Sequence, residues 1–279
     1  MTFMVCRVFP ALIKERKDQM TPNEALQGVR NQSPLVHCIT NYVAMNIAAN
    51  VTLAVGASPA MVHAVEEVAD FAAISAALTI NIGTLSAPWV NSMKAAATAA
   101  NAANVAWVLD PVAHFATPYR AQVALDLLDL KPAIVRGNAS EIIALAGDKG
   151  AGKGADSGNS VDDAQSSAIA LATRHNCVVA VSGAVDFITD GTRSASITGG
   201  SEIMPKITAL GCSQTAVVGA YAAVAPRLEA TVAAFVHFAQ AGEMAHTQSS
   251  GPGSFSVAFL DALHRLAPGD LSESRVSWH

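Results

Sequence analysis

The segment KITALGCSQTAVVGAY places a lone cysteine where chemistry is possible. Cys212 directly follows a glycine at the predicted start of a helix of small residues. A helix start presents free backbone N–H groups and the positive end of the helix dipole, which bind anions and favour thiolate over thiol. With residues 209–211 before it, this turn predicts an anion hole for a phosphoryl group in transfer. The alternative is that Cys212 is simply a small buried apolar residue.

Two other segments place acids and an arginine directly after predicted strands. VLDPVAHF supplies Asp110, and IVRGNASE supplies Arg136 and Glu141. Mg²⁺ is commonly held by one or two carboxylates together with substrate phosphates, so the two acids are candidate metal ligands and Arg136 a candidate phosphate contact. The alternatives are that Asp110 only caps a turn, and that Asn138 and Glu141 form a helix capping box beside an incidental arginine.

A hydroxyl stands at the end of a further predicted strand. VSGAVDFITDG puts Ser182 where it could contact a phosphate, or where a tight turn simply enters a hairpin. Ligands of open α/β sheets bind beyond the carboxyl ends of the strands. The polar residues predicted at such ends therefore indicate one shared site: His37, Asn41, Asn81, Asp110, Arg136, Asn138, Glu141 and Ser182.

Short apolar runs alternating with helix-length segments predict the scaffold that positions these residues. The strand candidates are 34–39, 77–83, 105–110, 133–136 and 177–183. The helix candidates are 43–55, 64–73, 86–103, 119–130, 161–175, 212–226, 229–247 and 254–266. Near-continuous apolar strands separated by helices are typical of an α/β fold with a mostly parallel central sheet and helices on both faces. DFITD and SASIT predict a short hairpin after residue 183.

The composition limits the class of protein. The chain has 279 residues, 51% hydrophobic and 14% charged, with a formal net charge of −5. We expect a single domain over 21–279, with 1–20 as a disordered extension. The lack of a basic cluster argues against a nucleic-acid partner, and no apolar run approaches the ~20 residues that span a bilayer. The four dispersed cysteines indicate reduced thiols in a cytoplasmic protein.

Taken together, these segments resemble the hydroxyethylthiazole kinases of thiamine salvage, within the ribokinase-like superfamily. The resemblance runs from about residue 33 to 266. It is carried by blocks in family order: SPLVHCITNYV, ANVTLAVGASPAM, HAVEEVADFA, LTINIGTLS, VLDPV, RGNASEI, GKGADS, GPGSF and FLDAL.

The resemblance implies a ribokinase-like fold and ATP-dependent, Mg²⁺-requiring phosphorylation of 4-methyl-5-(2-hydroxyethyl)thiazole. It also implies a homotrimer with sites between subunits. The residues it implies for thiazole binding are Asn41, Val43, Met61 and Ala209. Those it implies for the remaining roles are Arg136 and Ser182 for ATP, Asp110 and Glu141 for metal and phosphate, and Gly211 and Cys212 for catalysis.

Two departures from the family pattern fall near the expected phosphoryl-transfer site. The anion-hole loop, usually Gly-small-Gly-Cys, here begins with Ala209 and Leu210, and alanine is strained if the first position needs positive φ. Ala113 and His114 replace small glycine-rich residues. Because of these changes, one alternative is that the chain is a non-catalytic or weakly active relative that binds thiazole or nucleotide. A hydroxymethylpyrimidine-type kinase, which also has a cysteine at the helix start, is the other alternative.

Overall fold

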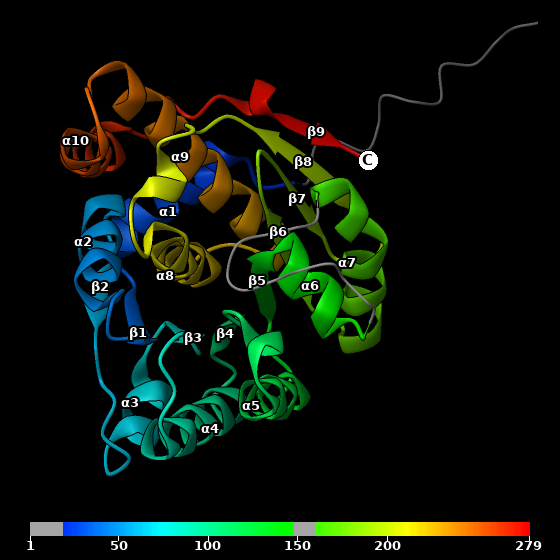
Figure 1. The fold of residues 1–279 in the computed structure, drawn as a ribbon. Coiled ribbons are helices and arrows are strands. Elements are labelled where there is room, and N and C mark those ends of the chain that lie inside the picture. Colours follow the sequence, from blue (N-terminus) through cyan, green and yellow to red (C-terminus); the bar gives the residue numbers. More distant parts are fainter. Residues whose placement is uncertain (1–18, 148–159) are drawn as a thin grey trace, which may run out of the picture.

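The computed structural model describes residues 19–147 and 160–279, and its strands form one nine-stranded sheet (Figure 1). Six neighbouring strands run parallel, in the order β2 (Ser58–Ala60), β1 (Leu35–Ile39), β3 (Ala77–Asn81), β4 (Ala106–Asp110), β5 (Ile134–Asn138) and β6 (Val178–Ser182). Three antiparallel strands extend this sheet: β7 (Val185–Thr189), β8 (Ser194–Thr198) and β9 (Val276–Trp278).

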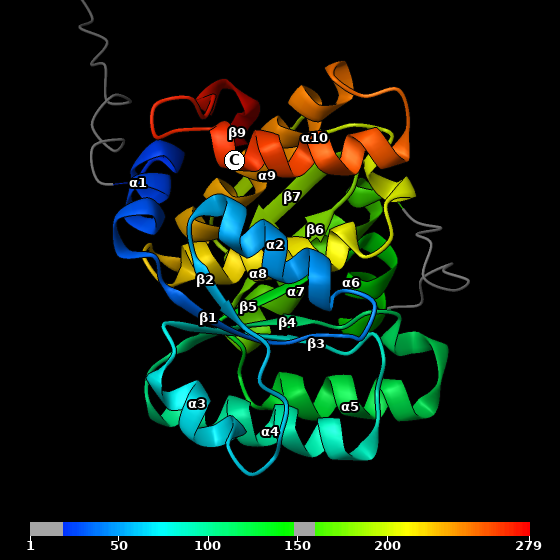
Figure 2. The ribbon, with the colours of Figure 1, turned by 90° about the vertical axis from the view of Figure 1, so that its left-hand side faces the viewer.

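Helices cover both faces of the sheet (Figure 2). On one face lie α1 (Pro22–Gln32), α2 (Met45–Val55), α8 (Leu210–Ala222), α9 (Arg227–Thr247) and α10 (Pro252–Arg265). On the other face lie α3 (Val68–Ile74), α4 (Ala87–Ala102), α5 (Pro118–Asp129), α6 (Ala139–Leu145) and α7 (Val161–His175). Short 3₁₀ turns occupy His114–Ala116, Met204–Lys206 and Glu273–Arg275.

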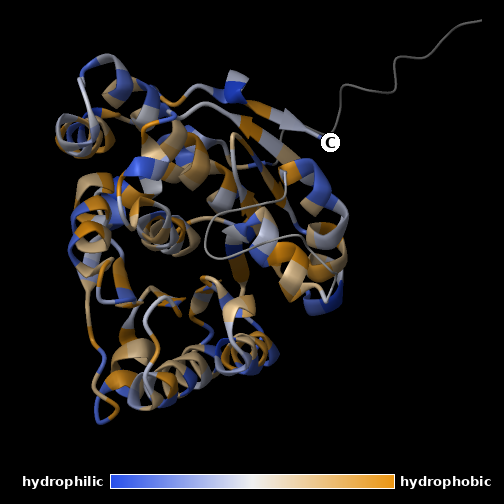
Figure 3. Cartoon of the chain, viewed as in Figure 1, coloured by the Kyte–Doolittle hydropathy of each residue, from blue (hydrophilic) through white to orange (hydrophobic). Residues whose placement is uncertain are grey.

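The strands are apolar on both faces because each face is covered by helices. Successive side chains of a strand point to opposite faces, so Val108 joins the core under α8 and α9 while Leu109 joins the core above α4. In the same way, Ile134 joins the core on the α8 side of the sheet and Val135 joins the core on the α4 side. Figure 3 shows the resulting concentration of hydrophobic residues along the strands and the helix sides that meet them. The expected α/β sheet, mostly parallel and covered on both faces, is confirmed.

The five parallel strands expected from the sequence are present, each within two residues of its expected limits. The sequence analysis did not include β2, β9 or α6, each of seven residues or fewer. Short elements carry little periodic pattern, so their existence depends on the neighbours they pair with. Of the extension predicted at residues 1–20 to be disordered, residues 1–18 lie outside the described part of the chain. Met20, at its end, packs against the core. In the two described stretches, no helix has the length and apolarity to cross a membrane.

Candidate active site

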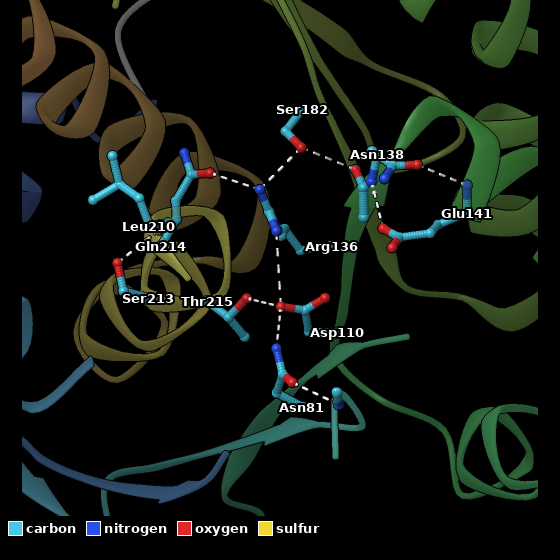
Figure 4. A network of polar contacts seen from close by, with 12 residues as sticks. Asn81, Asp110, Arg136, Asn138, Glu141, Ser182, Leu210, Ser213, Gln214 and Thr215 are labelled. Carbon is cyan, nitrogen blue, oxygen red and sulfur yellow. Dashed lines mark hydrogen bonds and ion pairs between the residues drawn. The ribbon is translucent and has the colours of Figure 1, made fainter. Parts of the chain in front are cut away.

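Parallel pairing brings the predicted polar residues together at one edge of the sheet. Asn81, at the end of β3, is in register with Asp110, at the end of β4. Asn138, at the end of β5, is in register with Ser182, at the end of β6. The first turns of α8 lie over these strand ends, so side chains from β3, β4, β5, α6, β6 and α8 meet in one network (Figure 4).

Asp110 is the buried centre of this network, with no exposed surface. Its Oδ2 accepts hydrogen bonds from Asn81 Nδ2 and Thr215 Oγ1, both at 2.7 Å, and lies 3.7 Å from Arg136 Nη1. Its Oδ1 is buried and has no hydrogen-bond partner among the described residues. Burial raises the pKa of Asp110, and the Arg136 charge and the two hydrogen bonds oppose that rise. One carboxylate oxygen is therefore held by the protein and the other is left to a ligand.

Arg136 links the acid to the nucleotide side predicted from the sequence. Nη2 donates to Ser182 Oγ at 2.9 Å and to Gln214 Oε1 at 3.1 Å, while the buried Nε has no partner among the described residues. A Cβ on Gly211 would lie 3.3 Å from Nη2. Glycine at 211 thus lets the start of α8 approach the guanidinium closely, which concentrates positive charge and backbone N–H groups at one point.

Glu141 has the capping role that was the alternative interpretation, and it also lies within the charged network. Its Oε2 accepts from the Asn138 backbone N–H at 2.8 Å, and Asn138 Oδ1 accepts from the Glu141 N–H at 3.0 Å, which completes a capping box. Its Oε1 accepts from the Ala113 N–H at 2.9 Å. Burial and the nearby Asp110 charge raise the pKa of Glu141 to about 7.

The loop before α8 adopts the conformation that glycine favours, although it contains alanine. Ala209 is the N-cap of α8 with φ +59°, and Ala113 before the 3₁₀ turn has φ +47°. Each left-handed residue of this kind costs roughly 1–2 kcal/mol. Leu210, the other departure in this loop, is only 2% exposed and packs in the core.

Cys212 is the third residue of α8 rather than its first. Burial and the Asp110 carboxylate raise the pKa of the thiol to about 11, while hydrogen bonds from Asn81 and Asn41 and the Arg136 charge lower it less. The sequence-based expectation that the helix start favours thiolate is therefore wrong here. Loss of hydration and a neighbouring anion outweigh the helix dipole.

Asn41, Val43 and Met61 have different surroundings. Asn41 is buried, donates from Nδ2 to Asn81 Oδ1 at 2.8 Å and accepts from the Ala44 N–H at 2.9 Å. Met61 follows β2 and packs partly against the core. Val43 is 57% exposed, so within one chain it is not enclosed with the polar network.

Three residues of the network received no role in the sequence analysis: Asn81, Gln214 and Thr215. Asn81 could have been assigned to the site, because it was one of the polar residues predicted at a strand end. The sequence evidence for Thr215 was weaker: it lies three residues after Cys212 and so shares that face of the helix. Nothing in the sequence singled out Gln214, whose partner Arg136 is 78 residues away.

The fold defines a structural class, the ribokinase-like α/β proteins. Bacillus subtilis pyridoxal kinase, solved as an ADP complex, shares the fold with a TM-score of 0.58 at 19% identity, over 75% of this chain and 92% of that one. A ribokinase-like superfamily protein from Enterococcus faecalis gives a TM-score of 0.59 at 11% identity, over 84% of this chain and 87% of its own. At these identities the likeness concerns the fold alone.

The chain belongs to the hydroxyethylthiazole kinase family, whose model matches residues 26–269. Hydroxyethylthiazole kinase of Roseobacter denitrificans is 60% identical over 254 residues, which is 91% of this chain and 99% of that protein. Its counterpart from Rhizobium leguminosarum bv. trifolii is also 60% identical, over 94% and 99% of the two chains. The hydroxyethylthiazole kinase protein of Pyrococcus horikoshii has a TM-score of 0.85 at 39% identity, covering 92% of this chain and 98% of its own.

Proposed function

We propose that this protein transfers the γ-phosphoryl group of ATP to the hydroxyl of 4-methyl-5-(2-hydroxyethyl)thiazole, a step of thiamine salvage. The observation that carries the proposal is the meeting of Asp110, Arg136 and the start of α8 at the carboxyl ends of the parallel strands. Phosphoryl transfer needs mainly positioning and charge stabilisation, and these groups supply both. Relatives that share 60% of the sequence bear the name of this activity.

On the nucleotide side, we assign Arg136 and Ser182 to ATP. Arg136 is held by Ser182 and Gln214, so its guanidinium is already oriented before a phosphate arrives. The backbone N–H groups of Gly211 and Cys212 lie at the positive end of α8 and stabilise charge that develops on the transferred group, whereas the Leu210 N–H already donates to Ile207 O. Gly211 keeps this end free of a side chain.

The acids at the site fit a Mg²⁺ ion held jointly with phosphates. Asp110 Oδ1 is a buried oxygen without a partner in the part of the chain that the structure describes, and Glu141 lies close enough for its pKa to respond to the Asp110 charge. Among the described residues there is no group of three or more His, Cys, Asp or Glu side chains that could hold a metal ion alone. Two carboxylates are enough when substrate phosphates complete the coordination. When bound, the ion would neutralise phosphate charge.

On the alcohol side, we assign Cys212 to the hydroxyl and Asn41, Val43, Met61 and Ala209 to the thiazole. A thiol with a pKa of about 11 is almost fully protonated near pH 7. Cys212 therefore orients the hydroxyl through hydrogen bonding and does not act as a strong base. As the alcohol oxygen bonds to phosphorus and the bond from phosphorus to the ADP oxygen breaks, the alcohol proton passes to an oxygen of the transferred phosphoryl group, which suits a loose transition state.

We also propose a homotrimer with sites between subunits, in the cytoplasm. The partly open surroundings of Val43 support the first point, because a substrate-binding side chain at 57% exposure would be enclosed by a neighbouring subunit. Tyr42 beside it is 62% exposed. Reduced thiols at Cys38, Cys177 and Cys212 support a reducing compartment. Light scattering on a size-exclusion column measures the oligomer directly.

The experiment that tests the function is ADP release by the purified chain with ATP and Mg²⁺, with and without the thiazole alcohol. Thiazole-dependent ADP together with a phosphorylated thiazole supports the proposal, and the Asp110→Asn variant is expected to lose this turnover. Thiazole binding without turnover would favour a non-catalytic relative. Faster turnover of a hydroxymethylpyrimidine in the same assay would favour the related kinase.

A further inference from the structure

Asn81 is a buried amide whose orientation is fixed by a backbone group. The Gly83 N–H donates to Asn81 Oδ1 at 2.9 Å, so that end of the amide must be the acceptor. The other end, Nδ2, therefore donates to Asp110 Oδ2 at 2.7 Å. Asn81 is 2% exposed, so water does not compete for these bonds. The direction of each hydrogen bond follows from the covalent chemistry of the chain.

A second amide continues this line of hydrogen bonds away from Asp110. Asn41 Nδ2 donates to Asn81 Oδ1 at 2.8 Å, and Asn41 Oδ1 accepts from the Ala44 N–H at 2.9 Å. Backbone N–H groups thus fix both amides, and every donor in the line points towards Asp110. The line ends on the same oxygen, Oδ2, that accepts from Thr215.

We propose that Asn81 is a positioning residue that joins the alcohol-binding side of the site, at Asn41, to the phosphate-binding side, at Asp110. This inference rests on the proposed function. Asn81 and Thr215 together occupy Oδ2 and fix the rotation of the carboxylate, which leaves Oδ1 as the oxygen available to a ligand. Asn81 also holds Asn41 in place through its Oδ1. One side chain therefore sets both the position of the proposed thiazole-binding residue Asn41 and the orientation of the Asp110 carboxylate.

Two substitutions separate the two sides of Asn81. In Asn81→Asp, one oxygen still accepts from Asn41 and Gly83, while the other places a second carboxyl group 2.7 Å from the Asp110 carboxylate, so that the two acids either repel each other or share a proton. In Asn81→Ala, both connections are lost. Thr215→Val removes the second donor to Oδ2 without touching Asn41.

A matched control is Asn23→Asp, the same change at an asparagine outside the site. Asn23 Nδ2 donates to Leu271 O at 3.0 Å, and Oδ1 accepts from the N–H groups of Gly269 and Leu271 at 2.9 and 3.0 Å. Asn81 has the same one donated and two accepted bonds, and in addition its side chain interacts with the Cys212 thiol. We expect Asn23→Asp to lower the unfolding temperature and to leave kcat and both KM values unchanged.

The test measures kcat and the separate KM values for ATP and thiazole alcohol on the folded full-length protein. Asn81→Asp and Thr215→Val should lower kcat at least about tenfold with thiazole KM within about threefold. Asn81→Ala should lower kcat and also raise thiazole KM, by about tenfold. Wild-type kcat in Asn81→Asp, or a loss confined to thermal stability as in Asn23→Asp, would overturn the proposal.

Calorimetric titration of ADP with and without Mg²⁺ gives a readout that does not depend on turnover. We expect the gain in ADP affinity on adding Mg²⁺ to fall at least about threefold in Asn81→Asp, because its carboxylate displaces that of Asp110. An unchanged gain in this variant would contradict the positioning role. If wild-type protein shows no thiazole-dependent turnover, the proposed function fails, whereas the titration still decides whether Asn81 positions Asp110.

Discussion

Asp110 and Arg136 form a buried ion pair in which each partner keeps one unsatisfied atom. Nη1 of the arginine lies 3.7 Å from Oδ2 of the aspartate, while Asp110 Oδ1 and Arg136 Nε have no partner among the described residues. Buried charged groups are rarely left incomplete in this way. A charged ligand that bound Asp110 Oδ1 and Arg136 Nε would supply the missing partners of both groups.

Replacing Ser182 with alanine removes one of the two side chains that hold Arg136 Nη2. The guanidinium then samples more orientations, so the KM for ATP should rise by up to about tenfold while the KM for the thiazole alcohol stays unchanged. Ser182→Thr, which keeps the hydroxyl, is the control and should behave like wild type. Steady-state kinetics with each substrate varied in turn distinguishes the two variants.

Cys212→Ala should lower kcat by about tenfold and leave ADP affinity unchanged, because the thiol positions the alcohol by hydrogen bonding. Loss of a true general base would cost about 10²–10⁴-fold. Unchanged turnover would remove Cys212 from the mechanism. Alkylation by iodoacetamide, followed by mass spectrometry, should be slow at pH 8, because a thiol with a pKa of about 11 is only about 0.1% thiolate there.

Ala209→Gly should stabilise the protein by up to about 1 kcal/mol, because removing the cost of φ +59° outweighs the unfolded-state entropy that glycine adds. Turnover should stay within about twofold, because the loop already has the left-handed geometry. The control, Ala170→Gly at an exposed interior position of α7, should destabilise by about 1 kcal/mol. Urea unfolding measures both, and a more than tenfold gain in kcat in Ala209→Gly would show that alanine misplaces the loop.

Glu141 gives the ligand-free protein a specific pH dependence of stability. Its pKa rises from near 4.5 to about 7 on folding, so between these values the folded state binds more protons than the unfolded state. The free energy of unfolding should therefore fall as pH rises from about 5 to 7, by at most about 1.4 kcal/mol per unit from this group. Glu141→Gln should have a lower free energy of unfolding at each pH, and this free energy should change less steeply with pH. Urea unfolding at several pH values measures both. An equally steep slope in the variant would assign the effect to other groups.

Gly219 lets α8 lie directly on the sheet. A Cβ at this position would lie 2.5 Å from Thr79 Cγ2, so Gly219→Ala should reduce the free energy of unfolding by about 1–3 kcal/mol. Thr79→Ser removes the opposing methyl group and should recover part of this loss in the double variant. Gly253→Ala, which has nothing within 4 Å of its Cβ, is the control and should be close to neutral.

The parallel sheet and its helices could be predicted because their patterns are local. Each β-strand from β3 to β6 begins with apolar residues and ends in a polar one, and the helices between them have the length that a crossover requires. Short β2 and β9 could not be predicted, because three residues that pair at a sheet edge carry no periodicity of their own. The α8 start shifted by two residues, since Ala209 turns the chain earlier than the glycine suggested.

The sequence by itself determined the family, the order of the central strands and longer helices, and the set of polar residues at strand ends, because each depends on local residue types and spacing. Only the tertiary structure decided how those residues meet. Thr215 reaches Asp110 across 105 positions, and Asn81 takes its bonding direction from Asn41 and Gly83. It also decided the state of Cys212: the dipole of a helix start is visible in sequence, whereas the burial and the Asp110 charge that outweigh it arise only when distant segments pack together.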